Sequence, residues 1–167
     1  MKKVLAALLL SAPLLGHSAG FAGVDVVFSN LEPDKTNRDA DLTSLQFKFG
    51  SWLNTENTFG FEFRAALGMD DDKIGGTEVE IDRFYGAYVR GQFPTNFQVR
   101  PYGLLGATRV ETTQTPGGSE NYSDISLGLG AEMTVSRNLF VSLEYLRAID
   151  RSGDEISNLS LGVGGRF

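Results

Sequence analysis

The chain has 167 residues, with 15 lysine and arginine residues against 21 aspartate and glutamate residues, a formal net charge of −6. This acidic balance argues against nucleic-acid binding, because phosphates require a basic surface. The sequence contains no cysteine, which excludes disulfides, thiolate metal ligands and cysteine nucleophiles.

The start of the chain has the pattern of an export signal. Two lysines precede an apolar run over residues 4–15, and small residues follow it. The run is shorter than the roughly 20 residues that a membrane-spanning helix needs. Cleavage is possible after Ala19, Gly20 or Ala22. We predict a signal peptide over residues 1–22, rather than a short buried helix, and a single mature domain over residues 23–167.

Eight stretches of the mature chain alternate apolar and polar residues, the pattern of a β-strand with one apolar face. They cover residues 24–29, 43–49, 59–67, 84–90, 97–109, 125–133, 139–146 and 158–167. The facing of the fifth stretch stays open, because Arg100 and Tyr102 share a face. An even number of strands is typical of closed outer-membrane barrels. We predict an all-β fold, an eight-stranded antiparallel up-and-down transmembrane β-barrel.

The connections between these stretches alternate between long and short. Polar segments follow every odd-numbered stretch, at residues 32–41, 70–80, 111–121 and 150–155. Shorter breaks follow the even-numbered ones, at residues 51–57, 93–96 and 135–138. Outer-membrane barrels have long loops at one end and tight turns at the other. We therefore expect the polar segments to be loops and both chain ends to lie on the turn side.

The apolar face of each stretch fits an outer wall in lipid, with charged residues inside. A soluble barrel of lipocalin type would reverse this arrangement, but the signal peptide and the aromatic placement favour the membrane. Four acidic and four basic residues are expected to form a lumen ion network: Asp25, Glu62, Glu132, Glu144, Lys48, Arg64, Arg90 and Arg166. Within it we expect Arg90 near Glu132, and Asp25 at the same turn end as Arg166.

Aromatic residues gather near the turn end of several stretches. They are Phe49, Trp52, Phe59, Phe93 and Phe97, with Phe167 at the last position. Outer-membrane barrels carry aromatic girdles where their wall meets the membrane interface. We predict that Phe49, Trp52, Phe59, Phe93 and Phe97 form such a girdle.

Three segments carry a resemblance to a known family. They are FYGAYVRGQFPTNFQVRPYGLLGA (84–107), SLGLGAEMTVSRNLFVSLEYLRAID (126–150) and the closing LSLGVGGRF (159–167). The chain resembles the small OmpA/OmpX-type outer-membrane β-barrels, an outer membrane protein β-barrel domain often labelled porin-like. The resemblance implies a location in the cell outer membrane after export through the periplasm. It also implies that Phe167 belongs to a signal read by the outer-membrane assembly machinery.

Catalytic chemistry has little support in the sequence. The single histidine, His17, lies inside the expected signal peptide, which removes Ser–His and Cys–His systems from the mature chain. Glu132 and Glu144 could serve as an acid–base pair, but we interpret them as members of the ion network. We predict no catalytic residues, no cofactor and no metal site.

The function that we expect is structural and interactive rather than enzymatic. The acidic loops would hold divalent cations that bridge lipopolysaccharide phosphates, or present a surface to a host or phage. The expected partners are outer-membrane lipid, lipopolysaccharide and the assembly machinery, with no nucleic acid, and the protein is expected to be a monomer. The alternative is a narrow porin-like channel for ions or small solutes.

Overall fold

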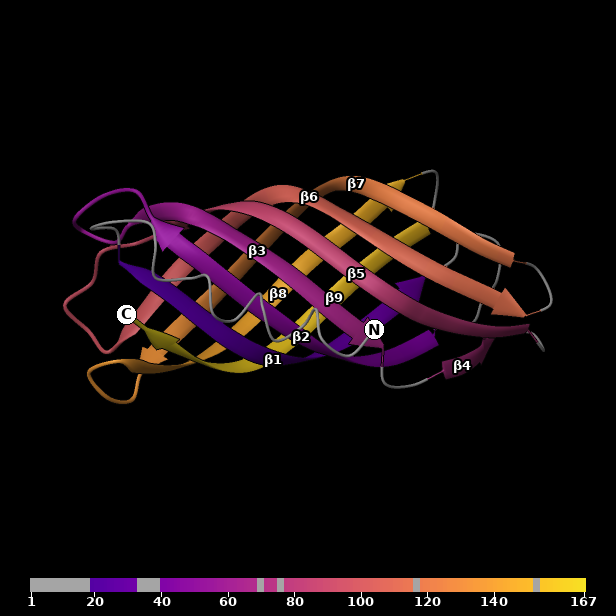
Figure 1. Cartoon of the computed structure of the whole chain (residues 1–167), viewed down its shortest axis with the longest axis horizontal. Helices are drawn as coiled ribbons and strands as arrows, with labels where there is room; N and C mark the ends of the chain where they lie inside the picture. The colour runs from indigo at the N-terminus through magenta and orange to yellow at the C-terminus, as the bar shows by residue number, and fades with distance from the viewer. Residues whose placement is uncertain (1–18, 33–39, 69–70, 75–76, 116–117, 152–153) are drawn as a thin grey trace, which may run out of the picture.

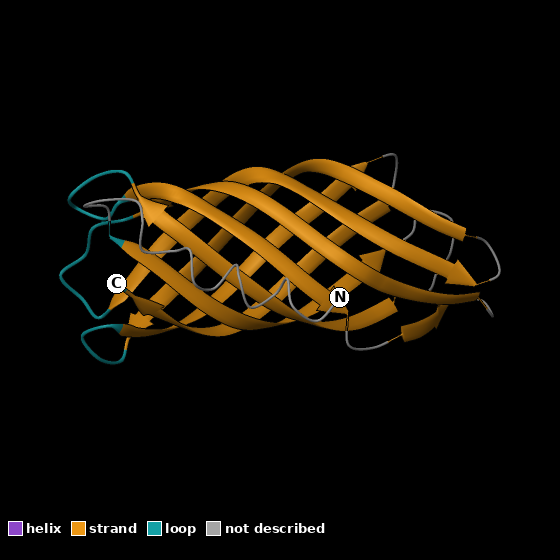
Figure 2. Cartoon of the chain, viewed as in Figure 1, coloured by secondary structure: helices purple, strands orange, loops and turns teal. Residues whose placement is uncertain are grey.

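The computed structural model describes residues 19–32, 40–68, 71–74, 77–115, 118–151 and 154–167. Within these ranges no helix is long and apolar enough to cross a membrane, and strands make up most of the chain (Figure 2). The expected signal peptide lies mostly outside the described residues and stays a prediction. The first strand begins at Gly20, three residues before the expected start of the mature domain.

The strands form one closed, antiparallel barrel (Figure 1). They are β1 (Gly20–Glu32), β2 (Ala40–Trp52), β3 (Phe59–Gly68), β4 (Asp71–Ile74), β5 (Thr77–Gln92), β6 (Val99–Thr115), β7 (Gly118–Thr134), β8 (Leu139–Arg151) and β9 (Asp154–Arg166). The short β4 pairs with β5 beyond the end of β3. The remaining eight strands pair in the order β3-β2-β1-β9-β8-β7-β6-β5, and β3 pairs with β5 to close the ring. The predicted eight-stranded barrel is confirmed.

The first and last strands meet where the short turns lie. β1 and β9 are antiparallel, with Val24 opposite Val163. Gly20 and Phe167 exchange two backbone hydrogen bonds of 2.7 and 2.9 Å. Where all eight strands overlap, closure pairs the backbone groups of each strand on both sides and leaves no open edge, which is the condition for a sheet to span lipid. Both ends of the described chain therefore lie on the turn side, as expected.

The expectation of long loops is wrong for three of the four polar segments, at 70–80, 111–121 and 150–155. β4 forms a hairpin with the start of β5. β6 and β7 stay paired as far as Gln114 and Gly118, and the β8–β9 ladder also continues to its tip. Ladder hydrogen bonds join backbone groups, so strands can continue beyond the apolar band whatever their side chains. Most of the segment 32–41 lies outside the described residues.

Side chains alternate between the lumen and the outer wall along each strand. On β7, Ile125 is 73% exposed whereas the adjacent Ser126 is completely buried. The facing of residues 97–109, which the sequence left open, is settled by Tyr102, Leu104 and Thr108, which are all buried in the lumen. The apolar face of the barrel therefore points outward.

Glycines on the inner wall make room for large side chains that face them from the neighbouring strand. A Cβ atom on Gly130 would lie 2.5 Å from the ring of Tyr102. A Cβ atom on Gly164 would overlap the ring of Phe140. The interior of an eight-stranded barrel is just wide enough for side chains to fill, so a bulky residue on one strand needs a small one facing it.

We predict that Gly130→Val lowers the free energy of unfolding by about 1–3 kcal/mol, because the added side chain overpacks the lumen. Gly91→Val is the matched control, since no atom lies within 4 Å of a Cβ placed on Gly91. Urea unfolding in lipid vesicles measures both. Equal stability of the two variants would show that Gly130 does not accommodate the Tyr102 ring.

Candidate functional site

The inward side chains fill the lumen in three layers. At the turn end, Phe21, Trp52 and Phe140 form an aromatic cluster. Toward the loop end lies a larger apolar cluster. Its members are Leu42, Ala66, Phe84, Tyr88, Tyr102, Leu104, Leu146, Ala148 and Ile156. The charged side chains lie next to both clusters, and Arg166 lies beside the aromatic one, opposite Phe21. Together they are the candidate functional site.

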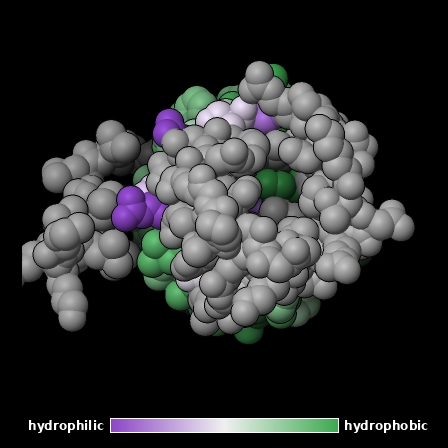
Figure 3. All heavy atoms as spheres, turned by 90° about the vertical axis from the view of Figure 1, so that its right-hand side faces the viewer, coloured by the Kyte–Doolittle hydropathy of each residue, from purple (hydrophilic) through white to green (hydrophobic). Residues whose placement is uncertain are grey.

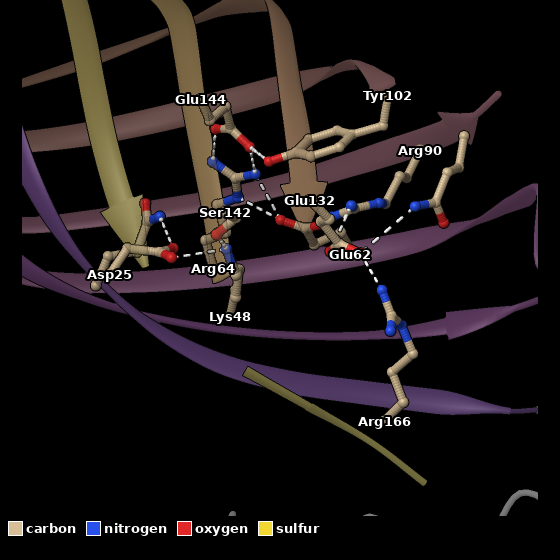
Figure 4. Close-up of polar contacts among 12 residues, drawn as sticks. Asp25, Lys48, Glu62, Arg64, Arg90, Tyr102, Glu132, Ser142, Glu144 and Arg166 are labelled. Carbon is tan, nitrogen blue, oxygen red and sulfur yellow. Dashed lines mark hydrogen bonds and ion pairs between the residues drawn. The ribbon is translucent and has the colours of Figure 1, made fainter. Parts of the chain in front are cut away.

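Six charged residues form one continuous chain of contacts across the lumen (Figure 4). In order they are Glu144, Arg64, Glu62, Arg90, Glu132 and Arg166. Glu62 accepts hydrogen bonds of 2.7 Å from both Arg64 and Arg90. Glu132 likewise accepts bonds of 2.7 Å from both Arg90 and Arg166. Each of these two carboxylates therefore bridges two guanidinium groups.

The Glu144 end of this chain ties three strands together. Arg64 on β3 donates to both carboxylate oxygens of Glu144 on β8. The hydroxyl of Tyr102 on β6 donates a 2.7 Å hydrogen bond to Glu144 Oε2. A bidentate arginine–carboxylate pair is among the strongest side-chain hydrogen-bonded contacts, so this pair braces opposite walls of the barrel.

A second, smaller group surrounds Asp25 on β1. Lys48 Nζ lies 2.6 Å from Asp25 Oδ1, and Gln46 donates a 2.9 Å hydrogen bond to the other carboxylate oxygen. Lys48 also donates to the hydroxyl of Ser142 on β8, at 2.9 Å. The carboxylate is therefore bonded through both oxygens, and its lysine reaches across the lumen.

The structure places all eight residues of the expected network inside the barrel, each in an ion pair. Arg90 and Glu132 are in contact, although β5 and β7 are not neighbours. Asp25 and Arg166 take different partners. In the β1–β9 ladder Asp25 faces Gly162, whereas Arg166 faces Phe21. Four residues separate these levels, about 13 Å along a strand, so Asp25 binds Lys48 and Arg166 binds Glu132.

Arg90 joins the charged layer to the aromatic cluster. Its guanidinium carbon lies 3.6 Å from the centroid of the Tyr102 ring, 5.0 Å from that of Phe21 and 5.6 Å from that of Trp52. A cation held over aromatic faces away from water gains about 2 kcal/mol or more. Arg90 is thereby fixed both by two carboxylates and by the rings around it.

The assignment of Trp52 to the outer girdle is wrong. Trp52 is 2% exposed, and its ring packs 5.3 Å from that of Phe21 inside the barrel. It lies three residues beyond Phe49, an odd number, so the two side chains face opposite sides of the sheet. The other expected members, Phe49, Phe59, Phe93 and Phe97, are exposed, and Phe49 stacks on Phe63 on the outer wall.

The apolar cluster toward the loop end was missed in the sequence. Its members occupy the same inward positions as the charged residues, as Ala66 does two residues after Arg64. The signal was present, because Phe84, Leu104 and Leu146 interrupt the otherwise polar or small inner faces of their strands. These residues exclude water from the side of the ion network that faces the loops.

The chemistry of the interior is that of a brace. Glu132 and Glu144, which the sequence allowed as an acid–base pair, bind arginines and not one another. In the described part of the chain, no three His, Cys, Asp or Glu side chains gather as a possible metal site. A hollow of about 190 Å³ lies at the turn end, where Gln92 and Arg100 line it together with residues of the two adjacent turns.

We predict that Asp25→Asn lowers the free energy of unfolding by about 3–5 kcal/mol, because Lys48 is left buried without its counter-ion. Adding Lys48→Met should recover most of this loss, since removing both charges also removes their desolvation cost. Trp52 is the single tryptophan of the chain, and its fluorescence during urea unfolding provides the measurement. A double variant no more stable than Asp25→Asn would contradict the pairing.

Comparison with known proteins agrees with this geometry. Residues 4–167 match a family model described as "Outer membrane protein beta-barrel domain". No curated protein matches the chain.

Solved structures with a similar fold are small outer-membrane barrels. Neisserial surface protein A is 18% identical, with a TM-score of 0.70 over 90% of this chain and 100% of its own. Ail of Yersinia pestis, in complex with the heparin analogue sucrose octasulfate, is 20% identical, with a TM-score of 0.67 over 90% of this chain and 99% of its own. The N-terminal barrel domain of Pseudomonas aeruginosa OprF is 14% identical, with a TM-score of 0.61 over 90% and 100%. At these identities the similarity concerns the fold.

Proposed function

The chain belongs to the outer membrane protein β-barrel domain family and lies in the cell outer membrane, and from this premise we propose that it is a non-enzymatic barrel with a closed lumen. Its role is to support the structure of the envelope and to interact at the cell surface. We propose that it acts as a monomer; its sheet closes within one chain and needs no second copy to complete it.

The filled lumen is the observation that carries this proposal. Glu62 and Arg90, in the middle of the barrel, are 0% exposed. Phe140 in the turn-end cluster and Ser126 nearer the loop end are equally buried. A passage wide enough for water would leave accessible surface on the side chains that line it. Among the residues that the structure describes, the interior therefore joins opposite sides of the barrel and offers no path to ions.

The surface role concerns the acidic segments 32–41 and 70–80 at the loop end. Carboxylates there would hold divalent cations, and these would bridge the phosphates of lipopolysaccharide. Ail was solved with a heparin analogue, which is a polyanion. A net charge of −6 disfavours a polyanion as the direct ligand of these segments, so we propose cation-mediated contacts.

The alternative, a narrow channel, makes the opposite prediction in planar bilayers. We expect the wild-type protein to give no steady open-channel current. Arg90→Ala removes a side chain from the centre of the filled lumen and should produce resolvable conductance steps. Leu127→Ala on the outer wall is the control and should stay silent. Steady conductance of the wild-type protein would overturn the closed-lumen proposal.

A deletion strain tests the envelope role directly. Loss of the protein should raise sensitivity to detergents and to large antibiotics. Complementation with the wild-type gene should restore resistance, because it returns the missing barrel to the outer membrane. Unchanged envelope integrity, serum resistance and adhesion in the deletion strain would contradict the proposal.

We further propose that Phe167 is read by the assembly machinery. Its side chain is 60% exposed, so its removal deletes few side-chain contacts, together with the two backbone hydrogen bonds to Gly20. Deleting Phe167 should lower the amount of inserted protein several-fold, while the refolded barrel loses at most about 1.5–3 kcal/mol for the side chain and about 0.5–1.5 kcal/mol for each hydrogen bond. Heat-dependent gel mobility of membrane fractions measures insertion. Normal insertion of the truncated protein would reduce Phe167 to a lipid-facing side chain.

A further inference from the structure

The polar hollow of about 190 Å³ lies at the turn end of the barrel. Two turns line it, residues 53–58 between β2 and β3 and residues 93–98 between β5 and β6. The turns lie next to each other because β3 pairs with β5, and the backbone N–H of Gln92 donates a 2.7 Å hydrogen bond to the carbonyl of Thr58. Figure 1 shows both turns at the end of the barrel that carries the C-terminus. The outer wall, seen from the loop end in Figure 3, is mostly hydrophobic around its circumference, so the polar lining sets the hollow apart.

Both turns are held in shape by hydrogen bonds from their own side chains. Asn54 Oδ1 accepts bonds of 3.0 Å from the backbone N–H groups of Thr58 and Phe59. The Asn54 amide nitrogen donates a bond of 2.6 Å to the Thr58 hydroxyl. In the other turn the Thr95 hydroxyl donates a bond of 2.8 Å to the carbonyl of Val99. The walls of the hollow are therefore formed before a ligand arrives, which lowers the entropic cost of binding.

Gln92 is a buried residue of the hollow with an acceptor atom to spare. Its side chain is 5% exposed, and its Oε1 has no hydrogen-bond partner among the residues that the structure describes. Its amide nitrogen reaches Glu132 Oε2 at 3.4 Å, which is beyond the usual range of about 2.7–3.2 Å. The oxygen and nitrogen of a carboxamide diverge from one carbon atom, so the oxygen points away from Glu132. A buried acceptor without a donor is unfavourable, and it favours a ligand that supplies one.

Arg100 adds a positive charge without a counter-ion to the same hollow. It is partly buried, and in the β6–β7 ladder it faces Glu132. That carboxylate binds Arg90 and Arg166 instead, and in the described part of the chain Arg100 forms no ion pair. Glu56 also lines the hollow, but it is exposed and is not paired with Arg100. The planar guanidinium of Arg100 therefore keeps a fork of donors that matches a carboxylate.

We propose that this hollow binds a small carboxylate with an N–H donor next to it. Arg100 binds the carboxylate, and Gln92 Oε1 accepts the hydrogen bond of the N–H group. Free α-amino acids and the C-terminal residue of a peptide share this chemistry. The volume equals that of roughly six water molecules, which suits a single residue with a small side chain. Closure of the lumen does not depend on this binding, so its failure would leave the closed-lumen proposal intact.

The test uses refolded full-length barrel in lipid nanodiscs and saturation-transfer NMR of L-alanine, with empty nanodiscs as the blank. We expect saturable binding with a dissociation constant on the order of 1 mM. Arg100→Gln should weaken it at least about 10-fold, because a charge-assisted contact is lost. Arg100→Lys should retain part of the affinity, because the charge remains. Gln92→Leu removes a neutral acceptor and should weaken binding by about 2- to 10-fold.

Arg137→Gln is the matched control, because Arg137 is an exposed arginine of the β7–β8 turn at the same end and does not line the hollow. It should change affinity by no more than about twofold. Heat-dependent gel mobility verifies that each variant is folded.

Two analogues of alanine identify the group that is recognised. L-Alaninamide lacks the carboxylate and should bind at least about 10-fold more weakly than L-alanine. N-Acetyl-L-alanine keeps the carboxylate and one N–H and separates the two sources: tighter binding than L-alanine assigns the hollow to peptide C-termini, and weaker binding assigns it to free amino acids. Absence of saturable binding by both L-alanine and N-acetyl-L-alanine would overturn the proposal. So would undiminished binding by folded Arg100→Gln, an equal loss with Arg137→Gln, or equal binding of L-alaninamide.

Discussion

Closure of the sheet by β1 and β9 is the constraint on which the rest of the structure depends. In lipid every backbone group has to be paired within the protein, and eight antiparallel strands achieve this by leaving no edge. The same closure makes the interior narrow. Inward side chains then meet those of distant strands, as Arg64 of β3 reaches Glu144 of β8, and bulky residues face small ones on the neighbouring strand, as the Tyr102 ring faces Gly130. The lumen is crowded because the ring is small.

The charges in the lumen follow from that crowding. Two buried ions need not stabilise a fold more than apolar packing would, because desolvation offsets their attraction. Their hydrogen bonds do fix the strands relative to one another. Glu62 and Glu132 each bind two guanidinium groups and so set the positions of several strands at once. The aromatic cluster on one side and the apolar cluster on the other keep water from these pairs. Water exclusion strengthens the contacts within the lumen.

The outer wall is more uniform in composition than the interior, and its composition changes at its two borders. Between them the exposed residues are apolar, as lipid requires. At the turn end phenylalanines such as Phe59 and Phe97 mark the border, and toward the loop end Phe28, Tyr85 and Tyr145 do so. The interior closes the barrel, whereas the outer wall is the surface that faces lipid.

The sequence by itself determined the class of the fold. A period of two residues places neighbours on opposite faces of any strand, so the eight runs, their inward charges and their apolar outer faces could be read without a structure. The inward facing of Lys48 and Arg64, and the outward facing of Phe59 and Phe97, follow from this local rule.

Tertiary structure decided which residues meet. Partners across the lumen depend on strand tilt and register, which a periodic pattern does not contain, and so Asp25 takes Lys48 while Arg166 takes Glu132. Nearness to a turn placed Trp52 in the girdle, but its odd separation from Phe49 puts it inside. The polar composition of residues 111–121 predicted a loop, but β6 and β7 continue there as paired strands. Ladder hydrogen bonds join backbone groups and do not depend on the polarity of the side chains. Periodicity is a property of one strand, whereas contacts, heights and strand ends are properties of the closed ring.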